Sequence, residues 1–140
     1  MDFFDMSQMN WWSILVGALI YMFTGALWYG PIAGKAWMAE MGYTEADLEG
    51  KSPVPALIKS QIAALVFSFG LAVILYNPAF SAVTPLEGAL IGAFLAVVFT
   101  GAGSFPNYAF ESRTLRHFLI HQGNIIVAMA LTGAVMGFWR

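Results

Sequence analysis

Four apolar stretches dominate the hydrophobic pattern of this sequence, and none carries a charged residue or a histidine through its middle. Each is about twenty residues long, and at about 1.5 Å per residue such a helix crosses the roughly 30 Å hydrocarbon core of a bilayer. We therefore predict an all-α integral membrane protein, a four-helix transmembrane bundle that forms a single domain over residues 1–140. The predicted spans are Trp11–Tyr29, Leu57–Tyr76, Leu86–Phe105 and Phe118–Trp139.

The segment between the first two spans has a helical pattern of its own. Bulky apolar residues recur on one side of Lys35–Met41, which predicts a short amphipathic helix lying in the membrane interface with Glu40 facing water. Thr44 is followed three residues later by Asp47, and this spacing predicts an N-cap for a further helical turn. We expect this first loop to be structured.

The second loop, Asn77–Pro85, is short and rich in turn residues. Short connections usually join elements that are adjacent in space. We therefore expect the second and third spans to be antiparallel neighbours.

Positive charge predicts how the bundle lies in the membrane. Cytoplasmic loops of membrane proteins carry an excess of lysine and arginine. We therefore expect the first and third loops to be cytoplasmic and both termini to lie on the non-cytoplasmic side. All the basic residues except Arg140 fall in or beside these two loops, namely Lys35, Lys51, Lys59, Arg113 and Arg116.

Aromatic side chains gather near the predicted span ends and in the first loop. Tryptophan and tyrosine are enriched there because an amphipathic ring can lie in apolar matter while its polar edge reaches water. We interpret these residues as interfacial anchors: Trp11, Trp12, Trp28, Tyr29, Trp37 and Trp139.

Composition agrees with a membrane protein and narrows its chemistry. Hydrophobic residues make up 59% of the chain and charged residues 10%, too few to solvate a water-soluble domain of this size. The net charge of −2 gives no basic face for nucleic acid, so we expect no nucleic-acid partner. Cysteine is absent, which excludes disulfides and thiolate metal sites.

Two glycine pairs at helical spacing predict close helix packing. Gly88 and Gly92 lie on the third span, and Gly133 and Gly137 lie on the fourth. Small residues four apart let two backbones approach closely in lipid. The pairs could form a seam between subunits, or they could pack inside the four-helix bundle.

The densest polar cluster lies at the predicted cytoplasmic end of the fourth span. His117 and His121 are four residues apart and share a helix face, the spacing at which a helix can present two imidazoles to one metal. No third ligand accompanies them, so we assign no metal site and no cofactor. The alternative is that these groups solvate the headgroup layer and hydrogen-bond to neighbouring helices. The cluster comprises Glu111, Arg113, Arg116, His117, His121, Gln122 and Asn124.

Nothing in the sequence indicates catalysis. It contains no Ser-His-Asp order, no HExxH, no phosphate loop and no paired intramembrane carboxylates. The span centres also lack the ionisable residue that proton-coupled transport normally keeps at membrane depth. We therefore expect no catalytic residues and predict that the protein is not an enzyme.

Several local motifs resemble one family of small bacterial membrane proteins, the domain of unknown function seventeen sixty-one. The resemblance begins in the first span and first loop, at Gly25–Pro31, Gly34–Met38 and Gly42–Leu48. It continues at Asn107–Arg113 and Gly133–Trp139, so it extends over nearly the whole chain.

The chain differs from the usual family pattern at Gly30, where serine is usual, and at Ser112, where glycine is usual. The resemblance implies four spans, a bacterial inner membrane and no established activity, so no catalytic residues carry over. It also suggests that the Trp28–Trp37 segment and the Asn107–Arg113 loop belong to one feature.

From these observations we predict a non-enzymatic membrane protein that associates with copies of itself or serves as an accessory subunit of a larger membrane complex. Membrane lipids and this homo-oligomer or complex are its expected partners. One alternative is a channel or carrier for an uncharged or amphipathic solute, with the polar cluster as its mouth. Another is a protein that binds a lipid, quinone or pigment.

Overall fold

The computed structural model describes residues 5–78 and 83–139, and the described part of the chain is helical throughout its regular elements. In chain order, the elements are α1 (Trp11–Leu27), η1 (Trp28–Ile32), α2 (Gly34–Met41), α3 (Glu45–Leu48), α4 (Val54–Leu75), α5 (Pro85–Leu95), η3 (Ala96–Gly101), α6 (Ala102–Phe110) and α7 (Leu115–Phe138). The elements η1 and η3 are short π-helical turns that continue the helices before them.

Four continuous helices are long and apolar enough to cross a membrane. They are α1 with η1, α4, α5 through α6, and α7, and they contain 22, 22, 26 and 24 residues respectively. The predicted all-α fold with four transmembrane helices is therefore confirmed. The short helix predicted in the first loop is α2, and the predicted capping box at Thr44 and Asp47 begins α3.

The third span runs further than the sequence pattern predicts, to Phe110 rather than Phe105. A proline commonly ends a helix, yet Pro106 lies inside α6. Proline is tolerated within membrane helices when side chains and local π adjustments satisfy the freed backbone groups. Here the π turn η3 precedes Pro106. The hydroxyls of Thr100 and Ser104 donate to the carbonyls of Ala96 and Gly101 at 2.5 and 3.4 Å, whereas the carbonyl that loses its usual donor at Pro106 is that of Ala102.

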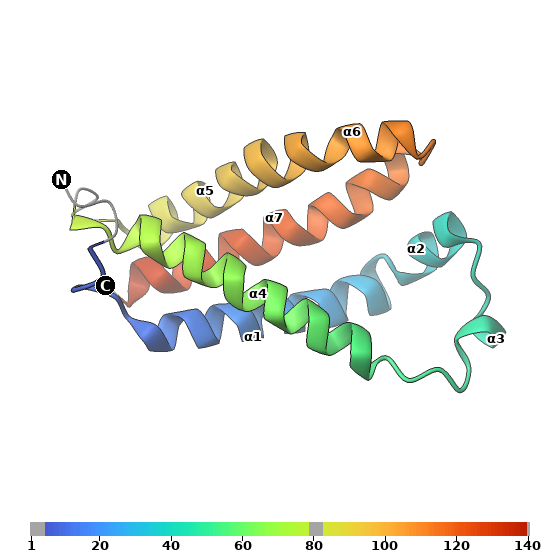
Figure 1. The fold of residues 1–140 in the computed structure, drawn as a ribbon, viewed down its shortest axis with the longest axis horizontal. Helices are drawn as coiled ribbons and strands as arrows, with labels where there is room; N and C mark the ends of the chain where they lie inside the picture. The colour runs from blue at the N-terminus through green and yellow to red at the C-terminus, as the bar shows by residue number, and fades with distance from the viewer. Residues whose placement is uncertain (1–4, 79–82, 140) are drawn as a thin grey trace.

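The four helices run side by side, and α7 lies at the centre of the arrangement (Figure 1). The beginning of α1 and the end of α7 lie at one end of the bundle (Figure 1). The other end holds α2, α3, the beginning of α4 and the turn between α6 and α7, and with them Lys35, Lys51, Lys59, Arg113 and Arg116. We call this the basic end.

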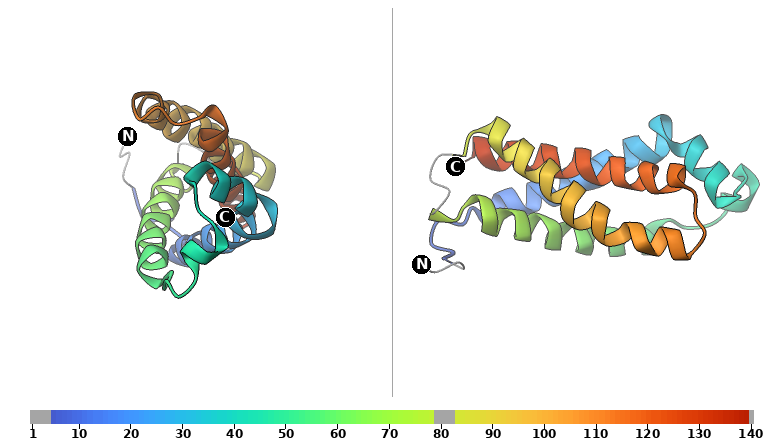
Figure 2. Two further views of the ribbon diagram at one scale, coloured as in Figure 1. Left: turned by 90° about the vertical axis from the view of Figure 1, so that its right-hand side faces the viewer. Right: turned by 90° about the horizontal axis from the view of Figure 1, so that it is seen from above.

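The second and third spans are antiparallel, as expected, but the prediction that they pack as neighbours is wrong. The main packing partner of α4 is α1, whereas α5 packs along α7. At the basic end α4 and α6 lie well apart (Figure 1 and Figure 2). Turn-rich connections fix the direction of two helices, but the side chains that interdigitate decide which helices touch.

Small residues fill the interior. Ala18, Ala64, Ala72, Ala96 and Ala128 are each at most 1% exposed, whereas many large apolar side chains point outward. Lipid tails are as apolar as leucine, so burying a large side chain between membrane helices gains little, whereas small residues allow close backbone packing. The bundle is therefore built with most of its bulky residues on the outside.

The helices α1, α4 and α7 meet most closely at Gly17. A Cβ atom at this position would lie 2.6 Å from both the Ser68 Oγ atom and the Thr132 Cγ2 atom. The Thr132 hydroxyl also donates to the carbonyl of Gly17 at 3.4 Å. Only glycine fits at this three-helix junction.

The two glycine pairs face each other across α5 and α7. A Cβ atom on Gly88 would lie 2.1 Å from the Gly133 carbonyl oxygen, and one on Gly92 would lie 2.2 Å from that of Met129. A Cβ atom on Gly137 would lie 2.5 Å from the carbonyl oxygen of Thr84, just before α5. Both pairs are thus occupied within one chain and do not present their small-residue faces to a second copy.

Candidate functional site

The candidate site lies at the basic end, where the first turn of α7 meets α2. Thr114 caps α7 by accepting a hydrogen bond from the His117 amide at 3.0 Å. Its hydroxyl also donates to the Glu40 carboxylate, and Arg116 Nη1 lies 3.7 Å from Glu40 Oε1. The expectation that Glu40 faces water is therefore wrong, because its side chain is only 12% exposed and joins α2 to α7.

The turn between α6 and α7 places the remaining charged residues. Ser112 adopts φ 54°, a left-handed conformation that glycine adopts without steric cost. This backbone reversal lets Arg113 turn back to Glu111, with Nε 2.8 Å from Oε2. Arg113 Nη1 also lies 3.7 Å from the Met41 sulfur, so the turn contacts the end of α2.

The two histidines of α7 face each other. His117 Nε2 and His121 Nε2 are 3.0 Å apart, and the Tyr29 hydroxyl lies 2.6 Å from His121 Nδ1. The Tyr108 ring, from α6, packs against both imidazoles at centroid distances of 5.5 and 6.3 Å. Residues from the first, third and fourth spans therefore surround one pair of imidazoles.

Tyr29, His121 and His117 form a continuous hydrogen-bonded chain. A neutral imidazole has one donor nitrogen and one acceptor nitrogen, so the chain can be oriented in either direction. When Tyr29 donates to His121 Nδ1, His121 Nε2 donates to His117. When Tyr29 accepts, the direction reverses and His121 Nε2 becomes the acceptor.

The π turn η1 brings Tyr29 and Trp28 to this site. Trp28 Nε1 donates to the Ile120 carbonyl at 2.8 Å. The Trp28 ring packs so closely against Gly123 that a Cβ atom on this glycine would lie 2.6 Å from the ring. The structure places both residues predicted as interfacial anchors, Trp28 and Tyr29, against α7. Trp37 packs edge-on against Tyr29 at a centroid distance of 6.0 Å. The first loop and the loop after α6 thus converge on one feature, as the family resemblance suggested.

The predicted polar cluster does not act as one unit, because Glu111 and Arg113 lie in the turn before α7 and the other members occupy different faces of α7. Gln122 turns toward η3, where its Nε2 atom donates to the Ala96 carbonyl at 2.7 Å and lies 3.0 Å from Thr100 Oγ1. Asn124 is 3% exposed, and its Oδ1 atom has no hydrogen-bond partner among the described residues. Only the two histidines and the charged residues nearest the turn meet at the site.

Glu40 and Thr114 belong to the site although no sequence motif assigned them to it, and Tyr108 was indicated only as part of the Asn107–Arg113 motif. The sequence could have indicated Thr114 as the N-cap of the fourth long helix, because threonine is a preferred N-cap residue just before a helix begins. Glu40 carried no such local signal, because its contacts with Thr114 and Arg116 are made between distant segments.

A polar pocket with a volume of about 520 Å³ opens at the basic end. Small-molecule sites in proteins commonly have volumes of roughly 300–1,000 Å³. Carboxylates, a guanidinium, hydroxyls and an imidazole share this pocket, so it suits a small polar ligand. Within the described residues, no group of three or more His, Cys, Asp or Glu residues is placed to hold a metal ion. The lining residues are Glu40, Glu111, Ser112, Arg113, Thr114 and His117.

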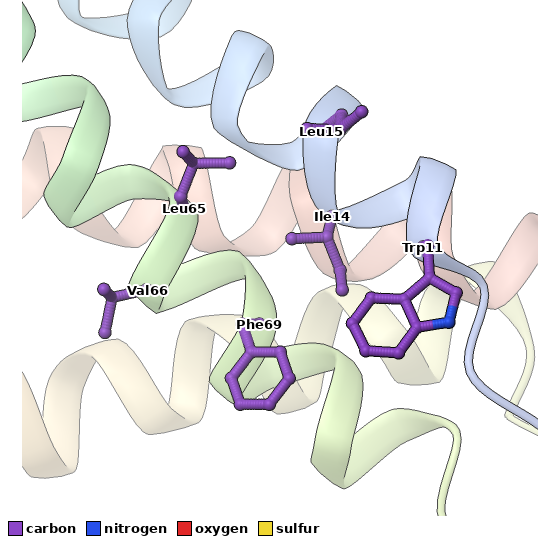
Figure 3. Close-up of a pocket in the computed structure, with 6 residues that line it drawn as sticks. All are labelled: Trp11, Ile14, Leu15, Leu65, Val66 and Phe69. Carbon is purple, nitrogen blue, oxygen red and sulfur yellow. The ribbon is translucent and has the colours of Figure 1, made fainter. Parts of the chain in front are cut away.

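A second pocket, of about 420 Å³, lies between α1 and α4 (Figure 3). It is lined entirely by apolar side chains: Trp11, Ile14, Leu15, Leu65, Val66 and Phe69. The rings of Trp11 and Phe69 stack with their centroids 6.5 Å apart.

Three of the predicted anchors lie at the end of the bundle opposite the basic end. Trp11 and Trp12 are 58% and 72% exposed, and Trp139 is 44% exposed.

One family matches this architecture. The family described as "Protein of unknown function (DUF1761)" matches residues 12–137, which include all four long helices and the candidate site. No curated protein and no solved structure matches the chain. Since the match covers nearly the whole sequence, the chain belongs to this family of proteins of unknown function.

Proposed function

We propose that the protein is a non-enzymatic membrane protein that assembles with a second copy of itself, and that such assembly underlies its role as a subunit of a membrane complex. Its helices cover little of one another's surface, and this observation carries the proposal. In the most apolar window of each long helix only 22–33% of the residues are buried.

The least covered surface lies at the basic end. Every residue of the first two turns of α4, Val54–Ser60, is exposed, and most of α6 is exposed as well. These two segments lie well apart in the bundle (Figure 2). A helix from a second copy, inserted beside the beginning of α4, would cover the exposed aliphatic side chains there, while the Lys59 ammonium group reaches the membrane interface.

Site-specific cross-linking tests this assembly well because the chain has no native cysteine. Ile58→Cys on α4 should cross-link two copies in native membranes. The matched control is Leu119→Cys on α7, since both residues are 56% exposed and each is the fifth residue of its helix. Particle mass in lipid nanodiscs gives an independent readout. The proposal is contradicted if the particle has the mass of a monomer and Ile58→Cys gives no more cross-linked product than Leu119→Cys.

A carrier for a small polar or amphipathic solute is the second candidate. The polar pocket favours it, because His117 lines that pocket and begins the hydrogen-bonded chain toward Tyr29 within the membrane-spanning region. Solute flux into liposomes tests this function. A saturable flux lost in His121→Gln supports the carrier, and no flux across a broad panel of polar solutes contradicts it.

Lipid binding is favoured by the apolar pocket between α1 and α4, whose volume and lining suit an acyl chain or a quinone tail. Native mass spectrometry tests this possibility. Retention of one lipid or quinone by the natural protein, lost when Leu65→Trp fills the pocket, supports it, and equal retention by both contradicts it.

For location, we propose a bacterial inner membrane with the basic end in the cytoplasm. Five lysine and arginine residues lie at that end, and retention of positive charge in the cytoplasm would orient the chain with both termini outside.

A further inference from the structure

We propose that His117 and His121 bind a divalent transition metal ion of the Zn²⁺ or Cu²⁺ type at the basic end. Such a site goes beyond the assembly role and does not depend on it. It concerns the two imidazoles that face each other with their Nε2 atoms 3.0 Å apart.

The spacing of the two nitrogens fits a shared metal ion. Zinc binds imidazole nitrogen at about 2.0–2.1 Å, so two nitrogens 3.0 Å apart subtend an angle of about 90–100° at the ion. Opening the pair by only about 0.4 Å gives the tetrahedral angle that zinc prefers. Side chains four apart on one helix can make this small adjustment by rotating their rings.

Tyr29 supplies the second feature of a metal-binding histidine. A histidine that ligates a metal through one ring nitrogen almost always donates its other N–H to an oxygen, which fixes the tautomer and the ring orientation. The Tyr29 hydroxyl lies 2.6 Å from His121 Nδ1 and can accept that hydrogen bond. His121 Nε2 then directs its lone pair at His117, and His117 Nε2 can bind the same ion when the His117 proton is on Nδ1 instead.

The surroundings can complete the coordination of a divalent ion. His117 lines the polar pocket, so water from the pocket can occupy the positions that the two imidazoles leave open; no carboxylate among the described residues is placed to serve as a third ligand. The two nearby arginines do not leave an excess of positive charge, since Arg113 pairs with Glu111 at 2.8 Å and Arg116 lies 3.7 Å from Glu40. Imidazole nitrogen suits Zn²⁺ and Cu²⁺ as well as iron and nickel ions, and of the divalent first-row ions Cu²⁺ binds such sites most tightly.

The first experiment uses Cu²⁺ as a spectroscopic probe on the purified full-length chain, carrying a tag without histidine and stripped of metal by a chelator. We expect one Cu²⁺ per chain, with an electron paramagnetic resonance spectrum that shows two coupled imidazole nitrogens. Zn²⁺ should compete with the copper for the site. Because the chain contains only two histidines, a two-imidazole spectrum identifies both ligands without any substitution.

Substitutions give the second test. His121→Gln and His117→Gln should each weaken Cu²⁺ binding by at least about tenfold and remove the two-nitrogen spectrum. Tyr29→Phe, which keeps the ring but removes the hydroxyl, should weaken binding about tenfold while leaving both nitrogens bound. Glu49→Gln, at an exposed residue of the first loop, is the control and should not change binding.

Three outcomes would overturn the site: no stoichiometric Cu²⁺ binding by the natural protein, a spectrum with fewer than two imidazole nitrogens, or equal binding by His121→Gln. Circular dichroism and gel filtration of each variant show whether it is folded. If a histidine variant does not fold, the spectrum of the natural protein still decides.

Discussion

Gly88 and Gly133 show how strongly a single residue can constrain this bundle. Gly88→Ala would place a methyl carbon 2.1 Å from the Gly133 carbonyl oxygen, a backbone atom that cannot move without separating α5 from α7. Overpacking of this kind typically costs roughly 1–3 kcal/mol. We expect a loss of about 2 kcal/mol in the free energy of unfolding, measured with denaturant in detergent micelles.

The control for this substitution is Gly103→Ala in α6, on the same long helix. A Cβ atom at Gly103 meets nothing within 4 Å. Alanine has a higher helix propensity than glycine by about 1 kcal/mol, so this variant should be unchanged or slightly more stable. Equal destabilisation by both substitutions would mean that α5 and α7 are not in close contact.

Ser112 is the other residue whose backbone conformation decides its identity. At φ 54° a non-glycine residue carries a steric cost of roughly 1–2 kcal/mol, which glycine avoids. Ser112→Gly should therefore raise stability by about 1 kcal/mol or less, because glycine also loses more entropy on folding. Ser112→Val should lower it, and thermal unfolding of the pair compares them. A valine variant as stable as the glycine variant would contradict the left-handed turn.

At the scale of elements, α3 depends on the charge of one carboxylate. Thr44 and Asp47 form a reciprocal capping box, with the Thr44 amide donating to Asp47 Oδ2 at 2.7 Å. Hydrogen bonds from Thr44 lower the pKa of Asp47 below its ordinary value of 3.8. A lowered pKa means that the ionised carboxylate stabilises the folded turn, so this contribution is present above the ordinary pKa and is lost as pH falls through the lowered one.

We therefore expect α3 to fray below about pH 4 while the long helices persist. Amide chemical shifts of Thr44 and Asp47 followed by NMR between neutral and acidic pH measure this change. In Asp47→Asn the pH-dependent change at these two amides should disappear. If it persists in that variant, another group controls the turn.

The elements also show where local patterns compete with their surroundings. A proline such as Pro106 normally ends a helix, but here it lies inside α6, shortly after the π turn η3, and the span continues to Phe110. Gln122 ties η3 to α7 through the Ala96 carbonyl. This contact joins the third span to the fourth, and the local sequence pattern does not specify such a contact between distant segments.

For the molecule as a whole, the proposed orientation predicts which positions an impermeant thiol reagent can reach. Because the chain has no cysteine, single substitutions at exposed serines report location directly. Ser7→Cys should be labelled in intact spheroplasts, whereas Ser52→Cys, at the basic end, should be labelled only after the membrane is opened. The reverse pattern, or labelling of both in intact spheroplasts, would contradict a cytoplasmic basic end.

The sequence predicts only part of the candidate site, because several of its contacts join residues that are far apart in the chain. The four-residue spacing of His117 and His121 is enough to place both on one helix face. Tyr29, however, lies 92 positions before His121, and Glu40 lies 74 positions before Thr114. Contacts across such separations depend on how whole helices pack, and no local pattern specifies them.

The four membrane helices follow from the sequence alone, since segment length and the absence of charge decide whether a helix is more stable in lipid than in water. The capping box of α3 follows from it too, because the residues that form it are neighbours in the chain. Three features depend instead on packing in three dimensions: the glycine pairs meet within one chain, α4 lies on α1 rather than beside α5, and Tyr29 meets His121. In lipid the hydrophobic effect does not favour one helix partner over another, so which helices pack together depends on the detailed fit of backbones and polar groups.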